Sequence, residues 1–92
     1  MDPCCMNNKL TKTERDHIAN VKSLPCSVCN QPAPSDAHHI RQDCQYTVIA
    51  LCKSCHQDPH NGIHGEKRMW WVMNMDEMQA LNVTIKRLLC LK

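Results

Sequence analysis

Two Cys-x-x-Cys pairs have the spacing of a single metal site. Cys26 and Cys29 form the first pair, Cys52 and Cys55 form the second, and 22 residues separate the pairs. Four thiolates with such spacing typically bind zinc in a closed tetrahedron, which stabilises a fold and leaves no position open for a substrate. The sequence therefore predicts a structural zinc ion held by these four cysteines.

Histidines form a second group of residues that could bind a metal or take part in catalysis. Five of the six histidines in the chain lie between positions 38 and 64. Imidazole changes its charge near neutral pH and serves both as a metal ligand and as a general base. A site with four cysteine ligands does not need them, so their density predicts a separate site. The candidates are His38, His39, His56, His60 and His64.

Histidines assembled by such a fold have the chemistry for phosphodiester hydrolysis. That reaction needs a base to deprotonate water, a cation to neutralise charge on the phosphoryl oxygens, and an acceptor that orients the base. Asp36 and Asp43 are the nearby carboxylates, and each is a ligand, an orienting group or an ordinary loop acid. In a strand, Asp36 would share a face with His38, and Asp43 would share the opposite face with His39.

The bulk composition favours a single metal-stabilised domain. The chain has 92 residues, no Phe and three aromatic residues, so its apolar core is expected to be thin. We expect a disordered lead-in over residues 1–10 and one domain over residues 11–92. The net charge is +2, and residues 26–65 alone carry −1. Global charge therefore gives no argument for DNA binding.

Local patterns predict a helix, a hairpin and a further helical turn. Thr11-x-x-Glu14 matches a capping box and predicts a helix over about residues 13–23, with Ile18 and Val21 facing inward. Residues 37–41 and 46–51 read as two strands of a hairpin, because the second run is rich in β-branched residues. Residues 53–57 follow as a helical turn.

The last part of the chain predicts two helices. The first covers about residues 66–73 and carries Trp70 and Trp71, which we expect in the core; a dimer contact or a base-stacking surface is the alternative. Asn74 is the expected cap of the second helix. That helix has an apolar stripe expected to pack on the zinc module, formed by Met78, Leu81, Ile85, Leu88 and Leu89. Lys67, Arg68, Lys86 and Arg87 are either phosphate contacts or a solvated helix face.

Taken together, these motifs resemble those of a known family. Cys26-x-x-Cys29, His38-His39-Ile40 and Leu51-Cys52-x-x-Cys55-His56 resemble an HNH endonuclease of the ββα-metal type with an embedded zinc site. The closer resemblance is to the bacteriophage recombination enhancement function (Ref) proteins, which are RecA-dependent nucleases. Asn61-Gly62-x-His64-Gly65 and Met75-Asp76-Glu77-Met78 carry that closer resemblance, which covers roughly residues 11–92.

The resemblance implies an α+β fold, a small zinc-stabilised ββα-metal module with flanking N- and C-terminal helices. It implies a phage or prophage DNA endonuclease in the bacterial cytoplasm, with DNA and a RecA filament as partners. His39 matches the general base and His38 a ligand of a catalytic Mg²⁺ or Mn²⁺. His56, His60 and His64 are further ligand candidates, and His60 and Asp43 complete the catalytic candidates. Asn61 departs from the family pattern, because it follows His56 rather than lying between the motif histidines.

Two other classes of protein remain as alternatives. A non-catalytic Cys4 zinc module that binds nucleic acid or protein would need the cysteines but not the histidines. A secreted protein with a disulfide framework would use the eight cysteines in pairs. The first twelve residues lack the apolar stretch of a secretory signal, and no run is long enough to span a membrane, so we expect a reducing, cytoplasmic setting.

Overall fold

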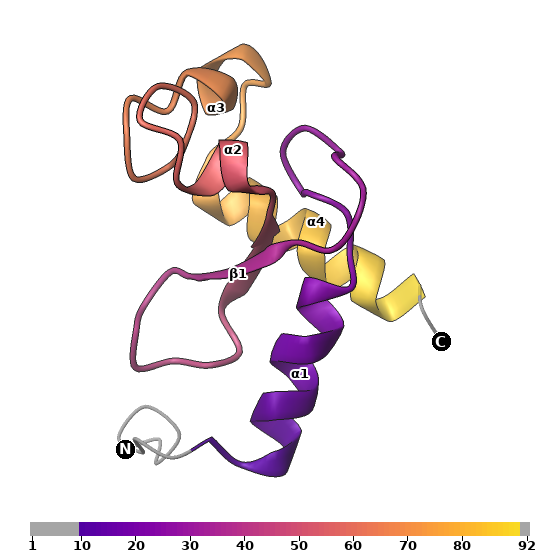
Figure 1. The fold of residues 1–92 in the computed structure, drawn as a ribbon. Helices are drawn as coiled ribbons and strands as arrows, with labels where there is room; N and C mark the ends of the chain where they lie inside the picture. Colours follow the sequence, from indigo (N-terminus) through magenta and orange to yellow (C-terminus); the bar gives the residue numbers. More distant parts are fainter. Residues whose placement is uncertain (1–9, 91–92) are drawn as a thin grey trace.

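The computed structural model describes residues 10–90, and within them it has two strands and four helices (Figure 1). In chain order these are α1 (Lys12–Lys22), β1 (Asp36–His39), β2 (Val48–Leu51), α2 (Lys53–His56), α3 (Arg68–Val72) and α4 (Glu77–Cys90). The α+β class expected from the sequence is confirmed. Nearly all of the predicted lead-in lies outside the described residues. No helix within residues 10–90 is both long enough and apolar enough to cross a membrane.

The two strands form an antiparallel hairpin whose faces carry different residues. Asp36 pairs with Leu51 and His39 pairs with Val48, which fixes the register. Because opposed residues of an antiparallel pair point to the same side, one face carries Asp36, His38, Ile49 and Leu51, and the other carries Ala37, His39, Val48 and Ala50. The four residues of β2 are buried, so the hairpin forms the centre of the molecule.

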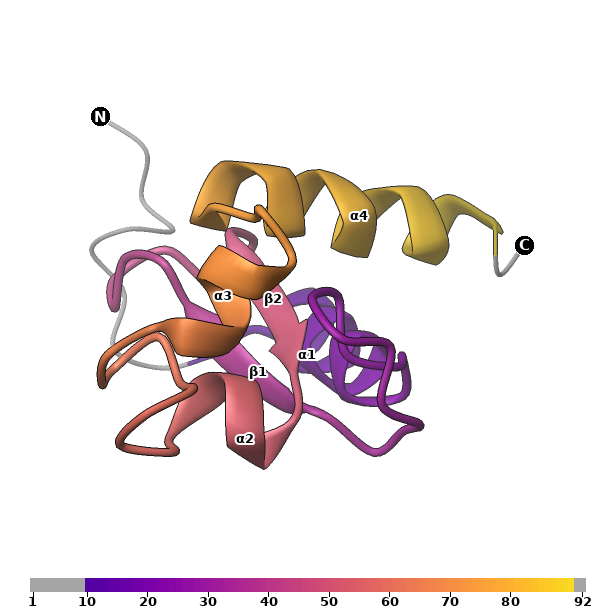
Figure 2. The ribbon, with the colours of Figure 1, turned by 90° about the horizontal axis from the view of Figure 1, so that it is seen from above.

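Each face of the hairpin has its own small core. Ile49 and Leu51 pack with the paired cysteines, Trp70 of α3 and Ala80 of α4. Val48 and Ala50 pack on the other side with residues from α1 and the segment after it. Figure 2 shows α4 running along one side of the hairpin, with α3 between α4 and α2. The two cores place the cysteines and α1 on opposite faces of the sheet.

Helix α1 begins at the predicted capping box. The Glu14 backbone N–H donates to the Thr11 hydroxyl at 3.1 Å, and the Thr11 N–H donates to the Glu14 carboxylate at 2.8 Å. These two bonds satisfy backbone donors that a free helix end would leave unpaired. Val21 is fully buried as expected, while Ile18 is only partly buried. The prediction of this helix is correct to within one residue at each end.

Helix α4 begins at a different cap from the one predicted. The Gln79 N–H donates to the Asp76 carboxylate at 2.7 Å, and the Asp76 N–H donates to the Gln79 side-chain oxygen at 2.9 Å. Asn74 instead has a left-handed backbone with φ of 52° and forms the turn that follows α3. The prediction of an Asn74 cap is therefore wrong, because the turn residue and the capping residue are two positions apart.

The buried face of α4 also differs from the predicted apolar stripe. Ala80 and Thr84 are fully buried, whereas Met78 is 71% exposed and Leu89 is 66% exposed. Small side chains let the helix approach β2 closely, so the Thr84 hydroxyl accepts the Ala50 N–H at 3.3 Å and bonds the Ser27 hydroxyl at 2.7 Å. Leu81 and Leu88 of the predicted stripe are partly buried, and Ile85 is exposed.

Replacing Thr84 by Val should destabilise the protein through unpaired polar groups rather than through lost volume. The substitution keeps the shape of the side chain but leaves the Ala50 N–H and the Ser27 hydroxyl without their partner. We expect a loss of about 1–3 kcal/mol in the free energy of unfolding, measured by urea denaturation. Thr84→Ser keeps the hydroxyl and should lose less. Equal losses in the two variants would contradict this account.

Candidate functional site

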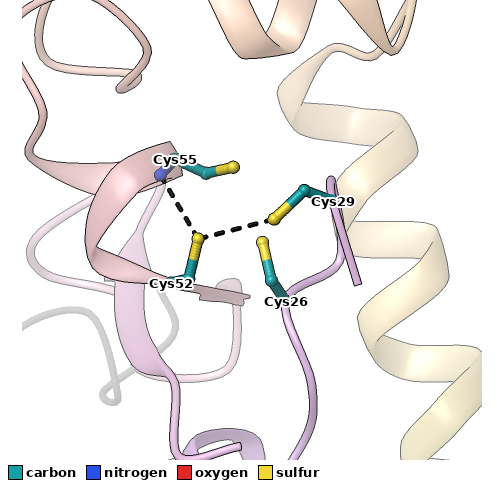
Figure 3. Close-up of side chains that lie close together, drawn as sticks. All are labelled: Cys26, Cys29, Cys52 and Cys55. Atoms are coloured by element: carbon teal, nitrogen blue, oxygen red, sulfur yellow. Dashed lines mark hydrogen bonds between the residues drawn. The ribbon is translucent and has the colours of Figure 1, made fainter. Parts of the chain in front are cut away.

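Four cysteine side chains converge where the loop between α1 and β1 meets the start of α2 (Figure 3). The sulfurs of Cys26, Cys29, Cys52 and Cys55 all lie within 4.8 Å of one another, and all four cysteines are free of disulfides. The Cys29 and Cys52 sulfurs are 3.6 Å apart. A tetrahedral zinc ion with Zn–S bonds of about 2.3 Å needs sulfurs about 3.8 Å apart. The cluster can therefore bind a metal such as zinc, with no disulfide among its members.

The surroundings of the cysteine cluster favour negative charge on one of its sulfurs, that of Cys26. Backbone N–H groups of Val28 and Cys55 donate to the Cys26 and Cys52 sulfurs, each at 3.4 Å. A hydrogen bond from the Cys55 thiol lowers the pKa of Cys26 to about 4, and the same contact raises the pKa of Cys55. Because zinc binds thiolates, the backbone donors and the low pKa of Cys26 prepare the cluster for a cation.

Helix α4 holds the first cysteine pair in place. The Arg87 guanidinium donates to the carbonyls of Cys26 at 3.1 Å and Pro25 at 3.3 Å, and to the Asn30 side chain at 2.9 Å. Asn30 follows the cysteine pair with a left-handed φ of 67°. Arg87 therefore has a structural role, which accounts for its position better than the phosphate contact considered from the sequence.

Loss of one cysteine ligand should cost the protein its zinc and its cooperative unfolding. We expect Cys55→Ser to lower bound zinc by about one ion per chain and to broaden the thermal transition, since a small metal domain folds with its metal. Cys90 is a matched control, because it is an exposed free thiol at the end of α4. Cys90→Ser should keep both properties. Zinc measured by atomic emission after gel filtration decides the point, and an unchanged zinc content in Cys55→Ser would contradict the assignment.

Three histidines form a second cluster beside the cysteines. His38, His56 and His64 each offer a ring nitrogen, and these nitrogens all lie within 4.8 Å of one another. The ring centroids are 4.9–5.1 Å apart in the three pairs. His38 is buried, His56 is half-buried and His64 is exposed, so the cluster opens to solvent on one side. The three predicted metal-ligand histidines are thus brought together, and we call them the histidine trio.

The chain brings the trio together with a tight loop after α2. His38 comes from β1, His56 from the last residue of α2, and His64 from the following loop. The loop folds back on α2 through bonds from the Ile63 N–H to the Cys55 carbonyl and from the His64 N–H to the His56 carbonyl. A side chain at Gly62 would lie 2.7 Å from the His56 carbonyl oxygen. Glycine is needed there because the backbone passes so close.

Two carboxylates orient the trio. Asp36 Oδ2 is 3.1 Å from His56 Nδ1, and Glu77 Oε2 is 2.8 Å from His38 Nε2. Carboxylates commonly hold metal-binding imidazoles in this way, which fixes the ring and raises its basicity. Asp36 was one of the carboxylates considered from the sequence, but Glu77 was missed as a site residue. Its one sequence signal was the Met75–Met78 segment of the family resemblance.

Burial and charge set the pKa values of His38 and of Asp36, which is bonded to His56. Burial lowers the pKa of His38, against the opposing effect of Glu77, so its imidazole favours the neutral, metal-binding form. A hydrogen bond from His56, helped by Lys53, lowers the pKa of Asp36. Asp36 therefore stays ionised near neutral pH. A neutral ring and an ionised neighbour are the states that a bound cation requires.

The donor atoms of the trio select among metals. Three imidazole nitrogens suit Zn²⁺, Co²⁺, Ni²⁺ and similar ions, whereas Mg²⁺ and Mn²⁺ prefer carboxylate, carbonyl and water oxygens. Glu77 and Asp36 are hydrogen-bonded to imidazole nitrogens and are outside the group of candidate ligands. The donor set therefore fits a second zinc-like ion better than the Mg²⁺ or Mn²⁺ that the resemblance implies.

The remaining predicted catalytic residues lie outside the trio. His39 is on the face of the hairpin that carries Val48 and Ala50, and its Nε2 is 2.8 Å from the Gln45 side-chain oxygen. His60 is bonded to Glu66 at 2.9 Å. Asp43 lies beyond the end of β1 and pairs with Arg41 at 3.1 Å. The catalytic roles of His39, His60 and Asp43 stay predictions.

Asn61 is also separate from the trio. Its backbone N–H donates to the Asp58 carboxylate at 2.9 Å, and its side-chain amide donates to the Ser54 hydroxyl at 3.5 Å. These contacts close the turn that follows α2. Asn61 therefore helps to shape the loop that carries His64.

None of the family models, curated proteins or solved structures compared with this chain matches it.

Neutralising Glu77 should weaken metal binding by the trio. We expect Glu77→Gln to lower the affinity for Co²⁺ at the trio by about 10- to 100-fold, because the His38 ring loses its charged acceptor. Titration with Co²⁺ of protein that carries one zinc ion per chain, at the cysteine cluster, measures this affinity by visible absorption. Asp16→Asn is a suitable control, since Asp16 pairs with Lys12 on the surface of α1. An unchanged affinity in Glu77→Gln would exclude Glu77 from the site.

Proposed function

We propose that this protein is a metal-dependent phosphodiester hydrolase, a DNA endonuclease of the HNH type. The observation that carries the proposal is the histidine trio, whose ring nitrogens lie within 4.8 Å of one another beside a separate four-cysteine cluster. A structural zinc module needs only the cysteines. A second cluster of metal-binding groups, open to solvent and oriented by two carboxylates, is the arrangement of a site that works on a substrate.

The order of the elements supports the proposal. The hairpin β1–β2 leads directly into α2, and the trio takes ligands from β1, from α2 and from the loop after it. A ββα-metal module has this order, with the cation held between the first strand and the helix. The family resemblance stated from the sequence implies the same order.

The residues of the chain have defined tasks in this mechanism. A cation held by the trio would supply a Lewis acid for the charge that grows on the phosphoryl oxygens. His38, His56 and His64 would hold that cation, and Glu77 and Asp36 keep two of the rings in orientation. His39 is the candidate base of the resemblance, and its hydrogen bond to Gln45 fixes its ring.

The position of His39 decides whether water is activated by His39 as a base or by a cation at the trio. The register of β1 points His39 away from the face that carries the trio. His39 would act as the base only where the scissile phosphate reaches around the end of the strand. Otherwise His39 would have a structural role through Gln45, and a cation held by the trio would supply the acidity that activates water.

Removal of an exposed member of the trio should abolish cleavage without unfolding the protein. We expect His64→Ala to lower the rate of nicking of supercoiled plasmid at least about 100-fold, because the cation loses one of three ligands. His64 is exposed, so the fold and the structural zinc should be unaffected. The assay compares Zn²⁺, Co²⁺, Ni²⁺, Mg²⁺ and Mn²⁺, and gel electrophoresis measures nicked product.

The control is His17→Gln. His17 lies on α1 and is the one histidine of the sequence that is not between positions 38 and 64. It should cleave like the wild type. His39→Ala, assayed in parallel, loses activity if His39 is the base and keeps it if the cation alone activates water. No cleavage by the wild type with any of these metals, on plasmid or single-stranded DNA, would contradict the proposal and favour the non-catalytic Cys4 module.

A further inference from the structure

One aromatic residue of α3 is exposed although the sequence predicted it in the core. Trp70 is 2% exposed, as expected, but its neighbour Trp71 is 75% exposed. An indole ring left in water loses the stabilisation that burial would give. Exposed tryptophan beside a concave surface is typical of recognition sites, where the ring offers a large, rigid apolar face.

A hollow lies between α3 and the start of α4, and Trp71 forms part of its wall. Its volume is about 250 Å³, and Lys67, Asp76 and Glu77 also line it. Pockets for drug-sized ligands have about 300–1,000 Å³, so this hollow suits a single ring system rather than a peptide or a helix. The hollow reaches the trio through Glu77, whose carboxylate is 2.8 Å from His38.

The elements around the hollow are fixed before any ligand binds. The Trp70 indole N–H donates to the Cys55 carbonyl at 2.9 Å, and the Trp70 carbonyl accepts the Met75 N–H at 2.9 Å. The Arg68 N–H donates to the His60 carbonyl at 2.9 Å. Helix α3 is thereby tied to the cysteine cluster and to the loop that carries His64. A rigid platform loses little entropy when it binds a ring.

The charges around the hollow indicate which part of a nucleotide it takes. Asp76 and Glu77 line its wall and would repel a phosphate, but carboxylates accept hydrogen bonds from the amino groups on the edges of bases. Lys67 at the same hollow offers one cation for a backbone phosphate. Each carboxylate already has one oxygen engaged, Asp76 with the Gln79 N–H and Glu77 with His38. An uncharged planar base on the indole ring would donate to their second oxygens while its phosphate stays outside, near Lys67.

We propose that this hollow binds one unpaired base of single-stranded DNA, stacked on Trp71, next to the phosphate held at the trio. The inference rests on the proposed function and names the form of its substrate. A paired base inside a duplex has both faces covered by its neighbours, so only an unpaired or extruded base reaches the ring. The substrate of the site is then single-stranded or locally opened DNA.

The test is binding of a short fluorescently labelled single-stranded oligonucleotide, measured by anisotropy with zinc-loaded protein and no other divalent metal. Stacking on an aromatic ring is strong enough that Trp71→Ala should weaken binding about tenfold or more. Trp71→Phe keeps a ring and should stay within about threefold of the wild type. Val72→Ala is the matched control, since Val72 is 77% exposed, adjoins Trp71 and does not line the hollow.

Equal affinity of Trp71→Ala and the wild type for the single strand would overturn the inference. A second result would also overturn the inference: a short arginine-rich peptide quenches the fluorescence of the exposed tryptophan and the oligonucleotide does not. The hollow would then bind a cationic side chain. His64→Ala separates this inference from the proposed function. It should lose cleavage, whereas adding Trp71→Ala to it should still weaken single-strand binding about tenfold further. If the wild type binds the single strand through Trp71 but does not cleave DNA, the proposed hydrolase function is rejected and the base-binding role of the hollow is kept.

Discussion

The convergence of four sulfurs is the constraint on which the rest of the structure depends. It joins residues 26–29 to residues 52–55, and the hairpin lies in the chain between them. Cys52 is also the cap of α2, because its sulfur accepts the Cys55 N–H. The position of α2 therefore follows from the geometry of the cluster. A domain of this size, with two small cores and one buried tryptophan, has little else to hold these segments in register.

Helix α4 connects this cluster to the trio. Near its C-terminal end, Arg87 binds the carbonyls of the first cysteine pair, and in its middle Thr84 bonds Ser27 and β2. At its first residue, Glu77 reaches His38. The helix thus carries a structural contact and a site contact at opposite ends. Because the three contacts share one helix, a shift of α4 would move the partner of His38 and the partner of the first cysteine pair together.

Features that depend on local chemistry could be read from the sequence, and features that depend on the approach of distant segments could not. The cysteine spacing, the Thr11 capping box and the β-branched second strand each give a short-range signal, and the structure has all three. His38, His56 and His64 were all among the metal ligands expected from the sequence, and the structure brings them together. Glu77 lies 39 positions from His38, and no spacing rule links them.

The errors in α3 and α4 have a common physical origin. An apolar stripe predicts which face of a helix could be buried, but the face that is buried depends on which side chains are small enough for close packing. Thr84 and Ala80 allow α4 to meet β2, and Met78 and Leu89 are left in solvent as a result. Trp70 and Trp71 differ for a similar reason, since adjacent helical residues point about 100° apart and only one can face the cysteine cluster.

A net charge of +2 gives the molecule little long-range attraction for DNA. On the proposed function, substrate must then be held by short-range contacts: the cation at the trio and the exposed ring of Trp71.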